Sequence, residues 1–237
     1  MDNVDILKEI CIKLDLPTLV NLFIALELTS MQVSKITDNT FWYHRAEFLV
    51  ERQLTERVNA NWKQIYWTLV PELRRIRDPR YIGREGEHTL LKDIFHIGLD
   101  TGLDLLLVLF ELYGEPRQSV HCWRTQIVYK VGDVEVLEYL IKNNYVDYDR
   151  RIALFHLHHI RSNTNLIKYV LACINPEPRD RNALLGTLKA SVTRLNKFEL
   201  VYDAIIPEPT REEMEELARY SIKWAHPSVN EFISSKS

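Results

Sequence analysis

Three histidines lie close together in the segment FHLHHIR, and they are the strongest candidates for chemistry in this chain of 237 residues. On a helix, His156 and His159 would share a face at the spacing i, i+3, which suits metal ligation. Two imidazoles make only half of a tetrahedral zinc site, and no cysteine or carboxylate is spaced to complete it. The phosphate-loop, GxSxG, HExxH and CxxC motifs are also absent from the sequence. We therefore expect no metal, no cofactor and no enzymatic activity, with a metal-assisted reaction at these histidines as a remote alternative.

Composition argues against several other classes of function. The formal net charge is −3, so the molecule as a whole has no electrostatic preference for nucleic acid or for an anionic membrane. The longest apolar run, Leu105 to Phe110, is far shorter than the 18 or so residues of a membrane-spanning helix. Only 7 residues are glycine, which disfavours tight-turn β architectures and favours helices. The acidic N-terminus and the scattered, odd number of cysteines predict a cytoplasmic or nuclear protein.

A period of 31 residues runs through most of the chain. Two similar segments, INPEPRDRN and IIPEPTREE, begin 31 residues apart. Polar segments that separate apolar ones recur at the same interval, and the residues 31 positions apart within them are Glu85, Pro116, Asp147, Pro178 and Pro209. These breaks predict five repeat units over residues 85–237.

Each unit contains a helix that is predicted to be buried. Twenty residues into each unit, and again three and four residues later, the side chain is apolar or aromatic, which is the pattern of one buried helix face. The fifteen positions are Leu105, Val108, Leu109, Val136, Tyr139, Leu140, Ile167, Val170, Leu171, Phe198, Val201, Tyr202, Val229, Phe232 and Ile233. A less regular pattern, at the position five residues into each unit, predicts a first helix. These equivalent positions, which we call a column, are Leu90, His121, Ile152, Ala183 and Met214. Such helix pairs cannot bury their apolar faces alone, so we expect them to stack into a solenoid.

One segment of this array resembles a known repeat. VGDVEVLEYLIKNN, from Val131 to Asn144, is similar to the second helix of an ankyrin repeat, and SNTNLIKYVL is a weaker copy. The Thr-Pro-Leu-His signature of ankyrin first helices is absent, and the period of 31 is shorter than the usual length of about 33. The resemblance therefore implies a degenerate ankyrin-like array in which the hairpins between repeats are reduced to turns. A generic α-solenoid is the alternative.

The first 48 residues do not follow the period and contain three short helical patterns. Pro17 suits the first turn of the second helix, and Thr29 or Ser30 can cap the third. The apolar positions that define the module are Ile6, Leu7, Ile10, Leu14, Leu19 and Leu22, followed by Phe41 and Trp42. Their order and spacing resemble an F-box, a trihelical module whose family docks onto the Skp-type adaptor of cullin-RING ubiquitin ligases. The opening Leu-Pro pair of that family is absent, with Asp2 and Asn3 in its place.

The resemblance implies an all-α protein with an F-box-like domain at 1–48, a helical spacer at 49–84 and the repeats at 85–237. Such an arrangement is similar to proteins of large DNA viruses of eukaryotes, and it implies a substrate receptor of a ubiquitin ligase. The implied adaptor-binding residues are Ile6, Leu7, Ile10, Leu14, Leu19, Leu22 and Trp42. The alternative is an ankyrin-like interaction scaffold whose N-terminal helices only cap the repeats and which has no ligase role.

A second surface is expected to hold the target protein. In ankyrin-like arrays the loops between repeats line up along one edge beside the first helices. Proline in these loops restricts φ, which stiffens the edge before a partner binds. The expected contacts, rich in the arginine and aromatic residues of binding hot spots, are Arg117, Trp123, Tyr148, Phe155, His158, Arg179, Arg181 and Arg211.

Overall fold

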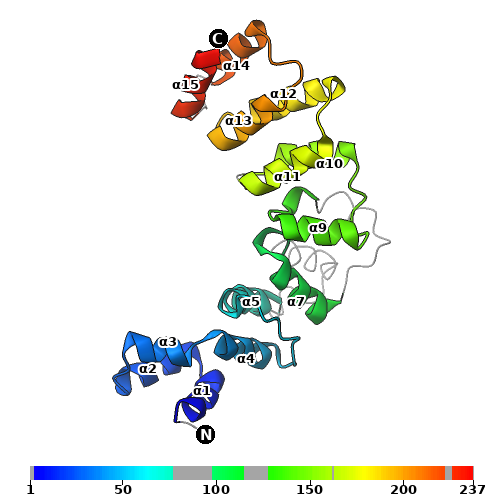
Figure 1. Ribbon diagram of the computed structural model, residues 1–237. Coiled ribbons are helices and arrows are strands. Elements are labelled where there is room, and N and C mark those ends of the chain that lie inside the picture. Colours follow the sequence, from blue (N-terminus) through cyan, green and yellow to red (C-terminus); the bar gives the residue numbers. More distant parts are fainter. Residues whose placement is uncertain (1–2, 77–97, 115–127, 162, 222–225, 237) are drawn as a thin grey trace. The chain divides into compact units, whose positions relative to one another are not determined.

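The regular structure of the chain is helical, as the composition predicts. A computed structural model describes residues 3–76, 98–114, 128–161, 163–221 and 226–236, and every regular element within them is a helix (Figure 1). None of the described helices is both long and apolar enough to cross a membrane. The chain divides into two compact units, one of Met1–Gly98 with Asp104–Glu115 and one of Leu99–Leu103 with Pro116–Ser237. The predicted domain boundary at residues 84 and 85 lies outside the described residues.

The first unit is built from short helices with local stop and start signals. Its described helices are α1 (Asn3–Lys13), α2 (Leu16–Ala25), α3 (Ser30–Ile36), α4 (Asn39–Val50), α5 (Trp62–Ile76) and α7 (Leu103–Tyr113). The Asp15 carboxylate accepts from the Thr18 amide to begin α2, and Pro17 lies in its first turn. Thr29 and Gln32 form a reciprocal capping box that begins α3. The predicted starts of both helices are thereby confirmed.

The core of the first unit lies mainly between α4 and α5, which pack against each other. Tyr66 is buried there against Trp42, and Trp62 is buried against Tyr43, whereas the neighbouring Trp67 is 46% exposed. Arg45 is buried on α4 and donates to the Cys11 carbonyl oxygen of α1 at 2.8 Å. Its guanidinium therefore ties α1 to the core that α4 and α5 form.

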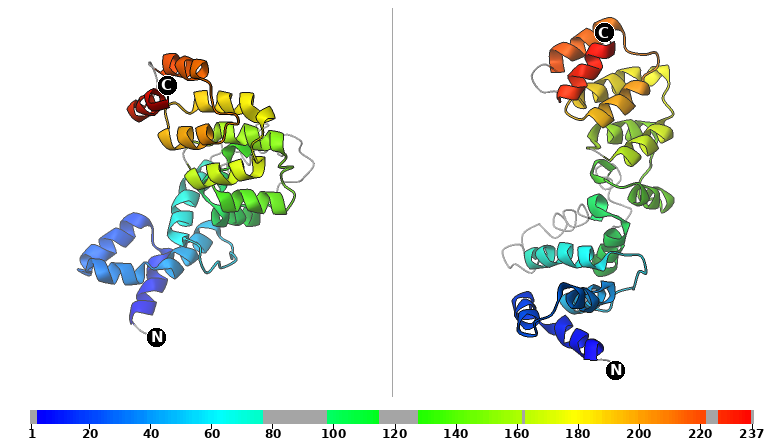
Figure 2. Two further views of the ribbon diagram at one scale, coloured as in Figure 1. Left: turned by 45° about the horizontal axis from the view of Figure 1, so that its top comes forward. Right: turned by 60° about the vertical axis from the view of Figure 1, so that its left-hand side comes forward.

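The second unit consists of helix pairs that stack on one another (Figure 2). Its described elements are η1 (Val128–Lys130), α9 (Val134–Lys142), α10 (Arg150–His159), α11 (Thr164–Ile174), η2 (Pro178–Asp180), α12 (Arg181–Ala190), α13 (Leu195–Asp203), α14 (Arg211–Ser221) and α15 (Pro227–Lys236). Within the pairs, α10 packs on α11, α12 on α13 and α14 on α15. Between the pairs, α10 packs on α12, while α9, α11, α13 and α15 pack in succession.

The predicted apolar stripe forms the core of these helices. Of its fifteen side chains, twelve are buried and three, those of Tyr139, Leu171 and Phe232, are half-buried. The first members of the stripe, on α7, are buried within the first unit. The 31-residue register therefore identifies the buried face of every second helix that the structure describes.

The first helices follow the period less strictly than the sequence suggests. Their buried column contains Ala153, Leu184 and Met214, at intervals of 31 and then 30 residues. Ala183 occupies the expected column within α12 but is exposed, and the buried side chain is that of the next residue, Leu184. Because the interval from Leu184 to Met214 is 30 residues, Met214 is buried like Leu184, while the second helices keep the interval of 31. A one-residue difference in the connecting segments is enough to rotate a helix by about 100° relative to the repeat.

Hydrogen bonds across the turns join successive pairs. The Gly132 amide donates to the Leu99 carbonyl oxygen at 3.0 Å, and the Asn163 side-chain amide donates to the Gly132 carbonyl oxygen at 2.8 Å. Lys197, 1% exposed, donates to the carbonyl oxygens of His158 and Ile160 at the C-terminal end of α10. A cation at this end complements the helix dipole, and burial lowers the pKa of Lys197 to about 8.

His156 is a buried structural histidine. Its Nε2 lies 3.2 Å from the Val131 carbonyl oxygen and must donate to it, because a carbonyl oxygen can only accept. The other nitrogen, Nδ1, therefore accepts from the Tyr148 hydroxyl at 2.8 Å. Burial lowers the pKa of His156 to about 4, so the ring is neutral near pH 7. With both nitrogens engaged, this side chain serves the packing of the stack and is not open to a metal ion.

Leu140→Ala tests the register. Leu140 is 0% exposed on α9, so truncation should lower the free energy of unfolding by about 2–5 kcal/mol, as core truncations do. Tyr220→Ala, at a side chain that is 54% exposed, is the control and should cost much less. Chemical denaturation of both variants gives the comparison, and equal small losses would contradict the register.

His156 should make stability depend on pH. Because its folded pKa of about 4 lies below the ordinary 6.5, the unfolded chain binds the proton first as the pH falls. This site therefore contributes fully above about pH 6.5 and loses about 3 kcal/mol as the pH approaches 4. Urea denaturation should show a shallower loss between pH 7 and about pH 4 in His156→Gln than in the wild type. Parallel curves for the two proteins would refute the assignment.

Candidate protein-interaction surfaces

The first three helices expose an unusual amount of apolar surface. We call it the N-terminal apolar surface, and it comprises Val4, Ile6, Ile10, Val20, Ile24, Leu26 and Met31, each between 45% and 69% exposed. Three short helices have too little interior to bury all of their apolar side chains. A concentration of exposed apolar side chains commonly marks a binding site for another protein.

The predicted adaptor-binding residues divide into three groups by their exposure. Ile6 and Ile10 lie exposed on α1, whereas Leu19 and Trp42 are buried, at 3% and 7% exposure. The indole of Trp42 donates to the Thr37 carbonyl oxygen at 3.0 Å, which fixes it within the module. The remaining three, Leu7, Leu14 and Leu22, are half-buried.

Sequence reasoning missed the exposed apolar side chains of α2 and α3. Val20 and Ile24 are not on the stripe that was assigned to the second helix, yet they belong to the same exposed surface. The signal lies in the segment LPTLVNLFIA, which has apolar residues on all sides of the helix. A helix of this kind can bury only part of its circumference in a small module, so the rest must face outward.

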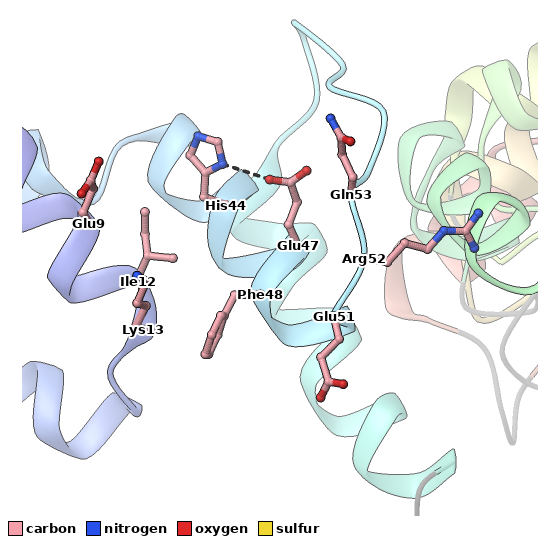
Figure 3. A pocket seen from close by; sticks show the side chains of 9 residues that line it. All are labelled: Glu9, Ile12, Lys13, His44, Glu47, Phe48, Glu51, Arg52 and Gln53. Carbon is pink, nitrogen blue, oxygen red and sulfur yellow. Dashed lines mark hydrogen bonds and ion pairs between the residues drawn. The ribbon is translucent and has the colours of Figure 1, made fainter.

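A groove of about 720 Å³ opens beside this surface, between α1 and the C-terminal part of α4 (Figure 3). Ile12 and Phe48 supply its apolar wall, and Phe48 is 55% exposed. The polar lining residues are Glu9, Lys13, His44, Glu47, Glu51, Arg52 and Gln53. This mixture of one apolar wall and charges of both signs suits contact with a protein side chain better than a reaction.

Glu47 in this groove has a structural task. It accepts from the Tyr43 hydroxyl at 2.7 Å and from the Leu54 amide at 3.0 Å, and His44 Nδ1 lies 3.0 Å from its second oxygen. Burial acts to raise the pKa of Glu47, but these hydrogen bonds together hold it below its usual range. The carboxylate therefore stays ionised while it fastens the segment that follows α4.

The expected target-binding residues have different surroundings in the second unit. Arg117 and Trp123 lie outside the described residues. Phe155 and His158 are exposed on α10. Arg179 and Arg211 are also exposed, at 68% and 79%, and they pair with nearby carboxylates, Glu177 and Glu215 respectively. These four described residues remain accessible to a partner.

Tyr148 and Arg181 instead hold neighbouring elements together. The Tyr148 hydroxyl is committed to His156, and burial raises the pKa of Tyr148, so it remains a donor. The guanidinium of Arg181 on α12 pairs with both carboxylate oxygens of Glu213 on α14. This bidentate contact lowers the pKa of Glu213 to about 2. Arg150, 31 residues before Arg181, makes the equivalent link from α10 to Asp180.

The histidine segment does not gather into a metal site. His156 is buried with both nitrogens engaged, while His158 and His159 are exposed. Among the described residues, no three His, Cys, Asp or Glu side chains are grouped so that they could hold a metal ion. The arrangement offers aromatic and basic contacts rather than ligands.

Comparison with known proteins provides no relative. No family model, no curated protein and no solved structure matches the chain significantly. Its functional interpretation therefore rests on the chemistry of these surfaces.

The two arginines of the repeat loops should differ in their effect on stability. Arg181→Ala removes a bidentate partner of Glu213 and should lower the free energy of unfolding clearly more than Arg179→Ala does. Arg179→Ala removes an exposed contact and should cost about 0.5 kcal/mol or less. Thermal or urea denaturation distinguishes them, and equal costs would mean that Arg181 does not join the two helix pairs.

Proposed function

We propose that this chain is the substrate receptor of a cullin-RING ubiquitin ligase, in which α1 to α3 act as an F-box-like domain and bind a Skp-type adaptor. The observation that carries the proposal is the N-terminal apolar surface. Its side chains are exposed in a module that already has a core of its own, which includes Cys11, Leu19 and Ile36. The exposed side chains are therefore not needed for folding, and burial against a partner would stabilise a complex.

The positions of Ile6 and Ile10 support the same interpretation. Both belong to the part of the chain that resembles an F-box, and they project from α1 at the spacing i, i+4, so they lie on one face. Glu9 and Lys13 lie beside them on the groove side of the helix. An apolar centre flanked by charged residues is the usual composition of a protein interface.

The second unit would hold the protein that is to be modified. The packing of α10 on α12, and of α9, α11, α13 and α15 in succession, supports a degenerate ankyrin-like solenoid for this unit. The receptor would catalyse nothing itself. By holding target and ligase together in the cytoplasm or nucleus of a eukaryotic cell, it would raise the effective concentration of target lysines near the conjugating enzyme.

A pure interaction scaffold is the alternative, with α1 to α3 as a cap for the repeats. Terminal caps of repeat arrays need a polar outer face to keep the protein soluble. The N-terminal apolar surface has the opposite character, since Ile24 and Met31 are each 69% exposed. Composition therefore favours the adaptor-binding role.

A binding experiment with the full chain tests the proposal. Purified protein is titrated with a purified Skp-type adaptor in complex with the N-terminal part of a cullin. The double variant Ile6→Asp, Ile10→Asp should bind about 100-fold more weakly, because two charges would be desolvated at the interface. Val58→Asp is the matched control, since Val58 is 88% exposed in the same unit but lies outside the surface.

Circular dichroism must show that all variants keep the helical content of the wild type. If the wild type does not bind the adaptor, the ligase role is wrong and the scaffold remains. If the double variant binds as tightly as the wild type, the adaptor is not held by this face of α1.

A further inference from the structure

One face of α10 is exposed although it carries large side chains. Arg151, Phe155 and His159 recur at intervals of four residues and therefore share this face. All three are exposed, and Phe155 is 47% exposed. On the opposite side, His156 and Leu157 are buried in the stack. The face is thus free of the packing that orders the rest of the helix.

Aromatic rings gather around this face. The ring centroids of Phe155 and His159 are 4.5 Å apart, and those of His158 and His159 are 5.3 Å apart. The Tyr129 ring of η1 lies 5.9 Å from His159, and the Lys130 ammonium lies 5.5 Å from the Tyr129 ring centroid. We call this set, completed by Arg151, the α10 surface. Packed rings present a wide apolar contact at low cost in side-chain entropy, which is typical of binding hot spots.

The α10 surface carries positive charge without its own counter-charge. Neither Arg151 nor Lys130 forms an ion pair with any carboxylate in the described part of the chain. Arg150, the neighbour of Arg151, is by contrast fully engaged with Asp180 and Glu177. The guanidinium and the ammonium are therefore available to acidic groups of a partner.

The neighbouring helix α12 carries a glycine at the position that corresponds to Phe155 in the repeat. Gly186 occupies the equivalent position on α12, 31 residues later, and α12 packs against α10. A Cβ atom at Gly186 would meet nothing within 4 Å, so no crowding requires glycine there. Glycine in a helix interior costs about 1 kcal/mol relative to alanine. A close approach of a partner's backbone at this point would account for that cost.

We propose that the α10 surface binds an acidic segment of the target protein that carries a large apolar side chain. The apolar side chain packs on Phe155 and lies over Gly186, while carboxylates on either side pair with Arg151 and Lys130. This inference rests on the proposed role of the chain as a target receptor. Exposed rings and cations also suit single-stranded nucleic acid, but the net charge of −3 opposes a polyanion with so many phosphates.

The test uses the full chain and short fluorescent peptides. The first peptide has a central leucine between runs of glutamate, the second replaces leucine by serine, and the third replaces glutamate by lysine. Fluorescence anisotropy should show that the first binds about tenfold more tightly than either of the others. Phe155→Ser and Arg151→Glu should each weaken its binding about tenfold, whereas Tyr220→Ser, an exposed ring on α14, should leave it unchanged.

Gly186→Gln provides a variant that is expected to keep the protein folded, because a Cβ atom at this position meets nothing within 4 Å. Glutamine favours the helix more than glycine does, so stability should rise or stay constant while peptide binding falls about tenfold. No saturable binding of the first peptide, tighter binding of a uridine-rich oligonucleotide, or full binding by both Phe155→Ser and Gly186→Gln would overturn the inference.

Adaptor binding by the same samples separates this inference from the proposed function. If the wild type binds the adaptor but not the first peptide, only the assignment of the α10 surface fails. If it binds the peptide but not the adaptor, only the ligase role fails. Phe155→Ser should bind the adaptor as the wild type does, because Phe155 lies in the other unit.

Discussion

The apolar stripes of the second helices can be buried only against the next helix pair, and the organisation of the second unit follows from this constraint. Val136, Ile167, Phe198 and Val229 are each 0% exposed because α9, α11, α13 and α15 pack in succession. A single pair would leave one side of its stripe in water. Burial therefore couples the stability of each pair to that of its neighbours. Truncation of one buried side chain lowers the stability of the adjacent repeats as well as its own.

Stacking also imposes a cost, since it buries polar groups that must find partners. His156 meets this demand with two hydrogen bonds, and Lys197 meets it by donating to carbonyl oxygens at the end of α10. Arg150 and Arg181 do the same at the loops, where each links its helix to the following pair. Histidine, lysine and arginine side chains, which often act in active sites, here form the hydrogen bonds that buried polar groups need and hold the helix pairs in position.

In the first unit, by contrast, part of the apolar surface is not buried within the unit. Its short helices α1 to α3 have more apolar side chains than their interior can accept, so Ile10, Ile24 and Met31 remain in contact with solvent. A stable core around Trp42 and Trp62 allows this surface to exist without loss of the fold. The proposed adaptor and the proposed target segment would then meet two surfaces of different character, one with an apolar centre and one aromatic with positive charge.

The sequence by itself determined the helical class, the place of Pro17 in the first turn of α2, a cap of α3 at Thr29 or Ser30, and the buried face of each second helix. These features depend on neighbours within a few residues, or on a repeated stripe, and both are visible in a linear pattern. Only the tertiary structure decided that Arg181 is paired while Arg179 is exposed, and that Met214 follows Leu184 after 30 residues. The reason is physical: periodicity reports which face of a helix is buried, whereas the partner of a side chain depends on groups that are distant along the chain and on the exact rotation of each helix.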